Sequence, residues 1–263
     1  MTRPALARPV SRARSLAGVA LAALVLAGCL PDDLTDYDWK ARQPDPLPAP
    51  VARGRVLVGT ASAGAVSVTL SIDEGPREGA NVVYVAGASA TVDASCGGAP
   101  MPVEPADDVP GATARVFLLP AAPGASCEIG ATVGQAAGSA RAAFPVVAVA
   151  SPTTLQRAGG GFVAWVRPVT PLVGRNALVV RTFDADARPA DAGVMDLYPY
   201  MDMGGGAGHS APYRAPQRTG AGRYEGEVDF IMSGRWDLTV YLDCDASATR
   251  TTARFPGFYV FDP

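Results

Sequence analysis

The chain has 263 residues, of which 48% are hydrophobic and 18% charged, so it can build a core and is not disordered by composition. Lys40 is the only lysine, which excludes a phosphate-binding loop ending in Gly-Lys-Ser/Thr. His209 is the only histidine, which excludes a zincin and leaves one imidazole for any catalytic triad. The 29 glycines and 24 prolines favour short elements over long helices. We therefore expect a β-rich protein without enzyme activity.

The first 28 residues have the layout of a bacterial export signal. Arginines up to Arg14 precede an apolar run at 15–26, which is too short to cross a bilayer. The following Leu-Ala-Gly-Cys at 26–29 resembles the bacterial lipobox, in which the cysteine is acylated and becomes the mature N-terminus. We expect residues 1–28 to be a lipoprotein signal peptide and Cys29 to carry the lipid. The alternative is an ordinary signal peptide with a chance cysteine.

Residues 29–53 are rich in proline and aspartate and show no apolar periodicity, so we expect a lipid-anchored, semi-extended tether. Without the basic leader, the remaining chain is acidic, and acidic surfaces are repelled by nucleic acid and anionic headgroups. The membrane partner is then reached through the lipid on Cys29. Leu30, and not an aspartate, follows the cysteine, a pattern that in enterobacteria directs a lipoprotein to the outer membrane, facing the periplasm.

Short apolar runs separated by Gly, Pro and Asp predict two sets of strands. Within 54–150 the candidates are 55–60, 65–72, 81–85, 88–92, 113–119, 127–133 and 140–147. Within 152–263 they are 162–167, 176–183, 193–200, 223–230, 235–242 and 251–261. The spacing indicates an all-β chain of two tandem immunoglobulin-like β-sandwiches, with one larger β unit as the alternative. Pro145 makes its strand an edge strand.

Three cysteines remain once Cys29 is set aside. An exported location is oxidising in many bacteria, so a disulfide is expected. Cys96 and Cys127 lie in the same predicted sandwich, and we predict that they pair. Cys244 is then left over, between two aspartates whose charge should raise its thiol pKa.

One methionine- and histidine-bearing stretch contains the candidate metal ligands. In an extended strand Met201 and Met203 point to the same face, and the glycine-rich loop after them allows His209 to fold back beside them. Thioether sulfur is a soft ligand that suits Cu(I), and imidazole binds Cu(I) or Cu(II). We predict a copper site at Met201, Met203 and His209, with Met232 as a further ligand. The alternative is that the methionines only fill the core.

Five pieces between residues 170 and 242 share their order and spacing with a known family. They are Pro-Leu-Val-Gly-Arg-Asn at 171–176, the Asp/Ala-rich run at 184–192, the methionine stretch ending in His209, Gly-Arg-Tyr-Glu-Gly at 222–226 and Met-Ser-Gly-Arg-Trp-Asp-Leu at 232–238. This part of the chain resembles the YtkA-like, FixH-like exported domain, here expected over about 160–260. The resemblance implies an immunoglobulin-like sandwich and a role in handling metals, copper above all. The family runs Met-Pro-x-Met-x-x-His, whereas here Asp202 replaces the proline and glycines precede His209.

Two functions are consistent with these features. The first is a lipid-anchored periplasmic or surface module that binds copper. The second is a structural or protein-interaction envelope lipoprotein without a metal, in which tyrosines contact a protein partner: Tyr198, Tyr200, Tyr213 and Tyr224. Asp184, Asp186 and Asp191 offer oxygen ligands for calcium, but their spacing better fits a hairpin turn.

Overall fold

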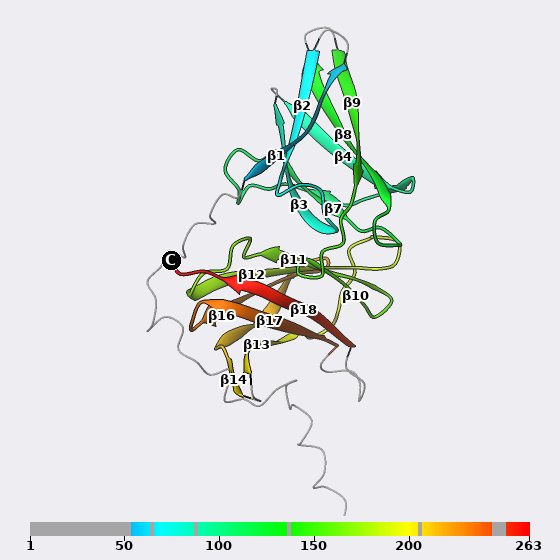
Figure 1. Cartoon of the computed structure of the whole chain (residues 1–263). Helices are drawn as coiled ribbons and strands as arrows, with labels where there is room; N and C mark the ends of the chain where they lie inside the picture. The colour runs from blue at the N-terminus through cyan, green and yellow to red at the C-terminus, as the bar shows by residue number, and fades with distance from the viewer. Residues whose placement is uncertain (1–53, 64–65, 87–88, 136–137, 205–206, 244–250) are drawn as a thin grey trace, which may run out of the picture.

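The computed structural model describes residues 54–63, 66–86, 89–135, 138–204, 207–243 and 251–263. All regular structure in these ranges is β-strand, and every ladder between two named strands is antiparallel (Figure 1). The predicted all-β class is therefore confirmed. Over the same ranges, no helix has the length and apolar character needed to cross a bilayer. The predicted signal peptide, the predicted lipid attachment at Cys29, the predicted tether and Cys244 lie outside the described residues.

The N-terminal sandwich consists of two sheets. The strand order in the first is β1 (Arg55–Ala63), β2 (Val66–Asp73), β3 (Gly79–Ala86), β7 (Ala114–Leu118), β6 (Val103–Glu104). The order in the second is β5 (Ala99–Pro100), β4 (Ala90–Cys96), β8 (Ser126–Gln135), β9 (Gly138–Val147). Alternation along β2 turns Val68, Leu70 and Ile72 into the core, where each is fully buried.

The C-terminal sandwich repeats this plan. Its first sheet runs β10 (Leu155–Ala158), β11 (Gly161–Arg167), β12 (Gly174–Phe183), β16 (Arg223–Phe230), β15 (Tyr213–Gly220). Its second runs β14 (Ala207–Ser210), β13 (Asp196–Gly204), β17 (Gly234–Leu242), β18 (Thr251–Val260). The strict alternation in β17 buries every second side chain against the first sheet: Trp236, Leu238, Val240 and Leu242.

The predicted disulfide between Cys96 and Cys127 is confirmed. The two residues are directly opposite each other where β4 pairs with β8, so the bond joins neighbouring strands of one sheet. Both cysteines of the described ranges take part in this bond, so neither is free. Strand β9, which contains Pro145, lies at the edge of its sheet as expected, because proline has no N–H to give to a second neighbour.

Five strands were not predicted: β5, β6, β10, β14 and β15. Each lies at the edge of a sheet, where one face or both are exposed and the hydrophobic pattern is weak. Strand β15, for example, contains Pro216 and buries only two of its eight residues. The strand expected from residue 193 begins instead at Asp196, because Gly193 adopts a left-handed turn conformation with φ of 58°.

The two sandwiches share an apolar boundary. In Figure 1 the N-terminal sandwich stands on the sheet that contains β11 and β12, and β3 contacts β11. Phe162, Val179 and Phe183 of the C-terminal sandwich belong to the same buried cluster as the N-terminal core. A boundary of this kind fixes the orientation of two domains, since separating them would expose these side chains to water.

Candidate functional site

The predicted metal ligands lie on or near the hairpin of β13 and β14. Met201 on β13 and His209 on β14 are cross-strand partners in the ladder. Directly opposite residues in an antiparallel pair project to the same face, with Cβ atoms about 5 Å apart. The register therefore places Met201 and His209 at neighbouring positions on one face of the sheet, with the thioether of Met201 extending towards Gly234 of β17.

Met203 lies at an irregularity in this hairpin. Asp202 pairs with Gly208 and Gly204 pairs with Ala207, so Met203 is an extra residue without a partner on β14. Asp202 stabilises the bend, because its Oδ1 accepts a hydrogen bond from the Gly204 N–H at 2.8 Å. A bulge changes the direction of the side chains that follow it. Strict alternation therefore fails here, and Met203 is 56% exposed.

Met201 is anchored at the margin of the core. Its side chain is only 7% exposed, and its Cε lies 2.8 Å from the position that a Cβ on Gly234 would occupy. Met232 lies two residues before Gly234, is half-buried and packs against the same core. Its carbonyl accepts a hydrogen bond from Trp236 Nε1 at 3.1 Å, which fixes the backbone beside the hairpin. Met201 and Met232 are therefore neighbours of the same glycine turn.

Glycine is required at position 208 of the hairpin. A Cβ there would collide with the backbone carbonyl oxygen of Met201 as well as with the ring and hydroxyl of Tyr200. Beside it, Ser210 donates a hydrogen bond from Oγ to the Pro199 carbonyl at 2.9 Å and ties β14 to β13. Gly208, which was expected to lie in a loop, is thus part of the strand β14 that holds His209 in register.

The residue types in this region restrict the ions it could hold. Within the described ranges, no three His, Cys, Asp or Glu side chains gather in a way that could hold a metal ion. A metal site on the hairpin would therefore depend on thioether sulfur, which favours a soft ion such as Cu(I) over zinc or calcium. The copper assignment stays a prediction.

The tyrosines divide into two groups. Tyr213 and Tyr224 are fully buried, so the prediction that they contact a partner is wrong: the sequence showed tyrosines near a loop, but their strands turn them into the core. The Tyr224 hydroxyl accepts a hydrogen bond from the Ala192 N–H. Tyr198 and Tyr200 are half-buried and stack, with ring centroids 5.7 Å apart.

The aspartates considered for calcium form a turn and an ion pair. Asp184 Oδ1 accepts hydrogen bonds from the backbone N–H groups of Asp186 and Arg188, both at 2.9 Å. Asp191 pairs with Arg218 at 2.8 Å. The interpretation of this stretch as a turn is therefore correct, because its carboxylates satisfy backbone and arginine donors.

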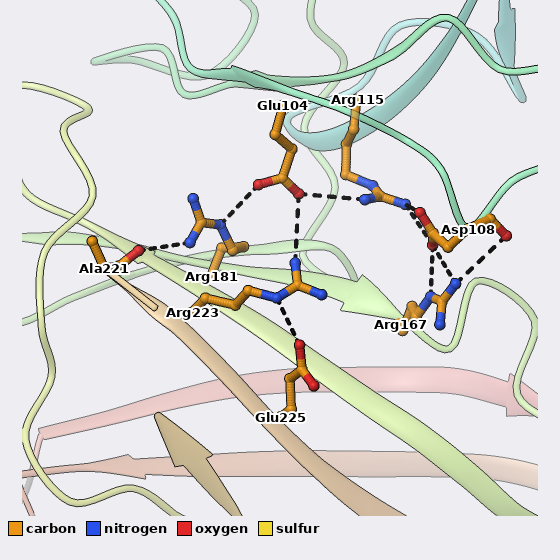
Figure 2. Close-up of polar contacts among 8 residues, drawn as sticks. All are labelled: Glu104, Asp108, Arg115, Arg167, Arg181, Ala221, Arg223 and Glu225. Atoms are coloured by element: carbon orange, nitrogen blue, oxygen red, sulfur yellow. Dashed lines mark hydrogen bonds and ion pairs between the residues drawn. The ribbon is translucent and has the colours of Figure 1, made fainter. Parts of the chain in front are cut away.

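A cluster of arginines and carboxylates that was not predicted from the sequence lies at the boundary between the sandwiches. Figure 2 shows Glu104, Asp108 and Arg115 of the N-terminal sandwich above Arg167, Arg181 and Arg223 of the C-terminal one. Glu104 pairs with Arg115 at 3.3 Å, Arg181 at 3.2 Å and Arg223 at 3.9 Å. Asp108 accepts hydrogen bonds from Arg115 at 2.8 Å and Arg167 at 2.6 Å.

The ion pairs of this cluster join the two sandwiches. Burial raises the pKa of Asp108, but the guanidinium groups of Arg115 and Arg167 outweigh it and hold the pKa below its ordinary value. The sequence contains one indication of this cluster: Arg115 and Arg181 each interrupt an apolar run that forms a central strand. A buried arginine needs a carboxylate partner. Which carboxylate takes that role depends on how the two sandwiches pack, and the sequence does not show this.

Residues 163–241 match the model of the family described as YtkA-like. This segment contains the four candidate copper ligands and confirms the YtkA-like expectation for that part of the chain. No curated protein matches the chain.

Three solved structures show a weak likeness to the chain. An endo-fucoidan hydrolase of glycoside hydrolase family 107 is 16% identical over 82% of this chain and 31% of its own, with a TM-score of 0.25. A β-glucuronidase from Parabacteroides merdae is 9% identical over 68% and 22%, with a TM-score of 0.22. The titin domains z1z2 in complex with telethonin are 14% identical over 81% and 98%, with a TM-score of 0.20. The chain spans less than a third of either hydrolase, and TM-scores this low carry no argument about its function.

Proposed function

We propose that this chain is a lipid-anchored, non-enzymatic binding module of the bacterial cell envelope. Its C-terminal sandwich binds Cu(I) through the β13–β14 hairpin. The match of residues 163–241 to the YtkA-like family supports a binding or structural module. Cys29 is the attachment point for the lipid, and the outer membrane, facing the periplasm, is the location that Leu30 favours.

The observation that carries the metal proposal is the register of the hairpin. Met201 and His209 are directly opposite each other, and Met203 follows two residues later toward the hairpin tip. Met201 is buried at the core margin whereas Met203 and His209 are exposed, so a bound ion would be shielded on one side and open on the other. The register pairs two donors, the Met201 thioether and the His209 imidazole, and the flexible side chain of Met203, beyond the bulge, would have to turn towards them to complete a trigonal set for Cu(I). Met232 beside the Gly234 turn is a fourth donor.

A Cu(I) competition titration tests this proposal. The full chain is titrated against a chromogenic Cu(I) chelator, and the double variant Met203→Ala/His209→Ala is expected to weaken binding at least tenfold because it removes two of the three donors. Both residues are exposed, so the variant should stay folded. The matched control is Val194→Ala/Gln217→Ala, which removes exposed side chains of the same sandwich that do not belong to β13 or β14. Equal affinity of the native chain and the double variant would show that the hairpin is not the site.

A structural or protein-interaction role is the second candidate, and the stacked Tyr198–Tyr200 pair favours it. These rings are half-buried, on the strand next to the exposed edge strand β14. Tyrosine is enriched in protein interfaces because it offers contact area with few rotors. A photo-crosslinking residue at position 198 should then give one discrete adduct in intact cells that persists with a Cu(I) chelator. A crosslinker at Gln217 is the control, and adducts that are equal at both positions would count against this surface.

A further inference from the structure

A cleft of about 710 Å³ lies between the two sandwiches. One wall comes from the end of β2, the turn before β3, and the strands β3 and β7. The other comes from β11, the loop at 168–172, β18 and the residues that follow it. Small-molecule sites have volumes of roughly 300–1,000 Å³ and occur preferentially at domain boundaries. The proposed copper hairpin contributes no residue to this cleft.

The N-terminal wall contains a carboxylate whose hydrogen bonding is incomplete. Asp73 is 5% exposed, and its Oδ2 accepts a hydrogen bond from the Tyr84 hydroxyl at 3.0 Å. Its Oδ1 is buried and has no hydrogen-bond partner among the described residues, and the same holds for Nε of Arg77 on this wall. A buried polar atom left without a partner costs about 1–3 kcal/mol. One acceptor and one donor are therefore unsatisfied at the same wall.

The charges on the walls compensate one another within the protein. Arg77 pairs with Glu74, and Arg115 is held by Glu104 and Asp108. Neither guanidinium is thus available as the counter-ion of an anionic ligand. A cationic ligand is disfavoured at Asp73, because the positive charges of Arg55 and Arg77 already act on that carboxylate and would repel such a ligand. A neutral hydroxyl fits this wall better, because it donates to a carboxylate and accepts from a guanidinium N–H.

The opposite rim of the cleft carries two exposed aromatic rings. Tyr259 is 49% and Phe261 is 46% exposed, whereas Val260 between them is fully buried. Both rings line the cleft, with centroids 4.8 Å apart. The backbone around Phe261 is fixed, since its N–H bonds to the Pro171 carbonyl and its carbonyl accepts from Val173. Core packing does not account for two exposed rings at the mouth of a cleft, and they form an apolar platform there.

From this combination we infer that the cleft binds an uncharged, hydroxylated ring with one apolar face, chemically a pyranose sugar. Its hydroxyl groups would donate to Asp73 and accept from Arg77. Its C–H face would lie against Tyr259 and Phe261.

Ligand-observed NMR saturation transfer on the full chain tests the inference. The probes are the methyl pyranosides of glucose, galactose, mannose and fucose, with glucosamine and glucuronate as charged comparisons. At least one methyl pyranoside should bind saturably and more tightly than the charged sugars. Phe261→Ala, which alters an exposed ring, and Asp73→Asn should each weaken binding about tenfold, the effect of losing one good contact. Val194→Ala is the matched control and should change affinity less than twofold.

Three results would overturn the inference: no saturable binding of any of the four methyl pyranosides, tighter binding of a charged sugar, or native affinity in Phe261→Ala. Should Asp73→Asn fail to fold, the Phe261→Ala result decides alone, because that side chain is exposed and its loss leaves the core unchanged. Loss of copper binding in the hairpin variant has no bearing on this test, since the two sites share no residue.

Discussion

Arg157 on β10 pairs with Glu78 of the N-terminal sandwich at 3.3 Å, and Glu78 has only 3% of its side chain exposed. The second nitrogen of the same guanidinium donates to the Pro120 carbonyl at 2.9 Å. One side chain of the C-terminal sandwich thus neutralises a buried carboxylate across the boundary and also holds a loop of the other sandwich. Removing a partner of a buried charge is more costly than removing a surface pair.

We predict that Arg157→Ala lowers the free energy of unfolding by about 2 kcal/mol, since Glu78 would stay buried without its counter-charge. Urea unfolding followed by tryptophan fluorescence measures this. Arg188→Ala is the matched control, because the Arg188–Asp186 pair is exposed on both sides and should contribute less than about 0.5 kcal/mol. Equal effects of the two variants would mean that the Glu78 contact does not support the boundary.

The stability of the boundary should depend on pH through Asp108. Its pKa is lowered in the folded protein, because Arg115 and Arg167 outweigh the effect of burial. Near the ordinary aspartate pKa of about 3.9, the unfolded chain therefore binds more protons than the folded protein. The ionised Asp108 carboxylate stabilises the folded state above that pH, and this stabilisation is lost as the pH falls through the pKa of the folded protein. Asp108→Asn should flatten the acid limb of the stability profile. Asp107→Asn, which changes the exposed neighbour outside the ion cluster, should keep the native slope.

Loss of the disulfide should destabilise the N-terminal sandwich. The bond joins residues with a sequence separation of 31, and closing a loop of that length contributes about 3–4 kcal/mol by restricting the unfolded chain. Cys96→Ala/Cys127→Ala should lower the midpoint of thermal unfolding measured by calorimetry. Native protein in a reducing agent should show the same shift, whereas the agent should leave the double variant unchanged. A reductant effect on the variant would show that the shift has another origin.

Lipid attachment is tested at Cys29. Cys29→Ala should move the protein from the membrane fraction to the soluble periplasmic fraction, because several acyl chains give a stable anchor whereas the acidic mature chain has little attraction for anionic headgroups. Metabolic labelling with an alkyne fatty acid should mark the native protein and not the variant. A variant that stays in the membrane fraction would point to a protein partner as the anchor.

Local patterns predicted the individual strands where a strand is central. Trp236, Leu238 and Val240 alternate with polar residues, and the core of the C-terminal sandwich buries all three. The same reasoning failed at edge strands such as β14 and β15, because a strand with both faces near solvent needs no alternation of apolar and polar residues. It also failed at Met203, because a bulge of one residue breaks the alternation that placed two thioethers on one face.

The amino-acid sequence by itself determined the all-β class, the pairing of Cys96 with Cys127 and the YtkA-like segment. The first depends on patterns within single strands, the second on both cysteines lying in one predicted sandwich, and the third on the order and spacing of motifs along the chain. Tertiary structure alone decided the ion pairs between the sandwiches, the cleft beside Asp73 and the burial of Tyr213 and Tyr224. Each of these joins residues far apart in the chain, or depends on which way a strand faces. Such contacts follow from how whole sheets pack, which no local pattern encodes.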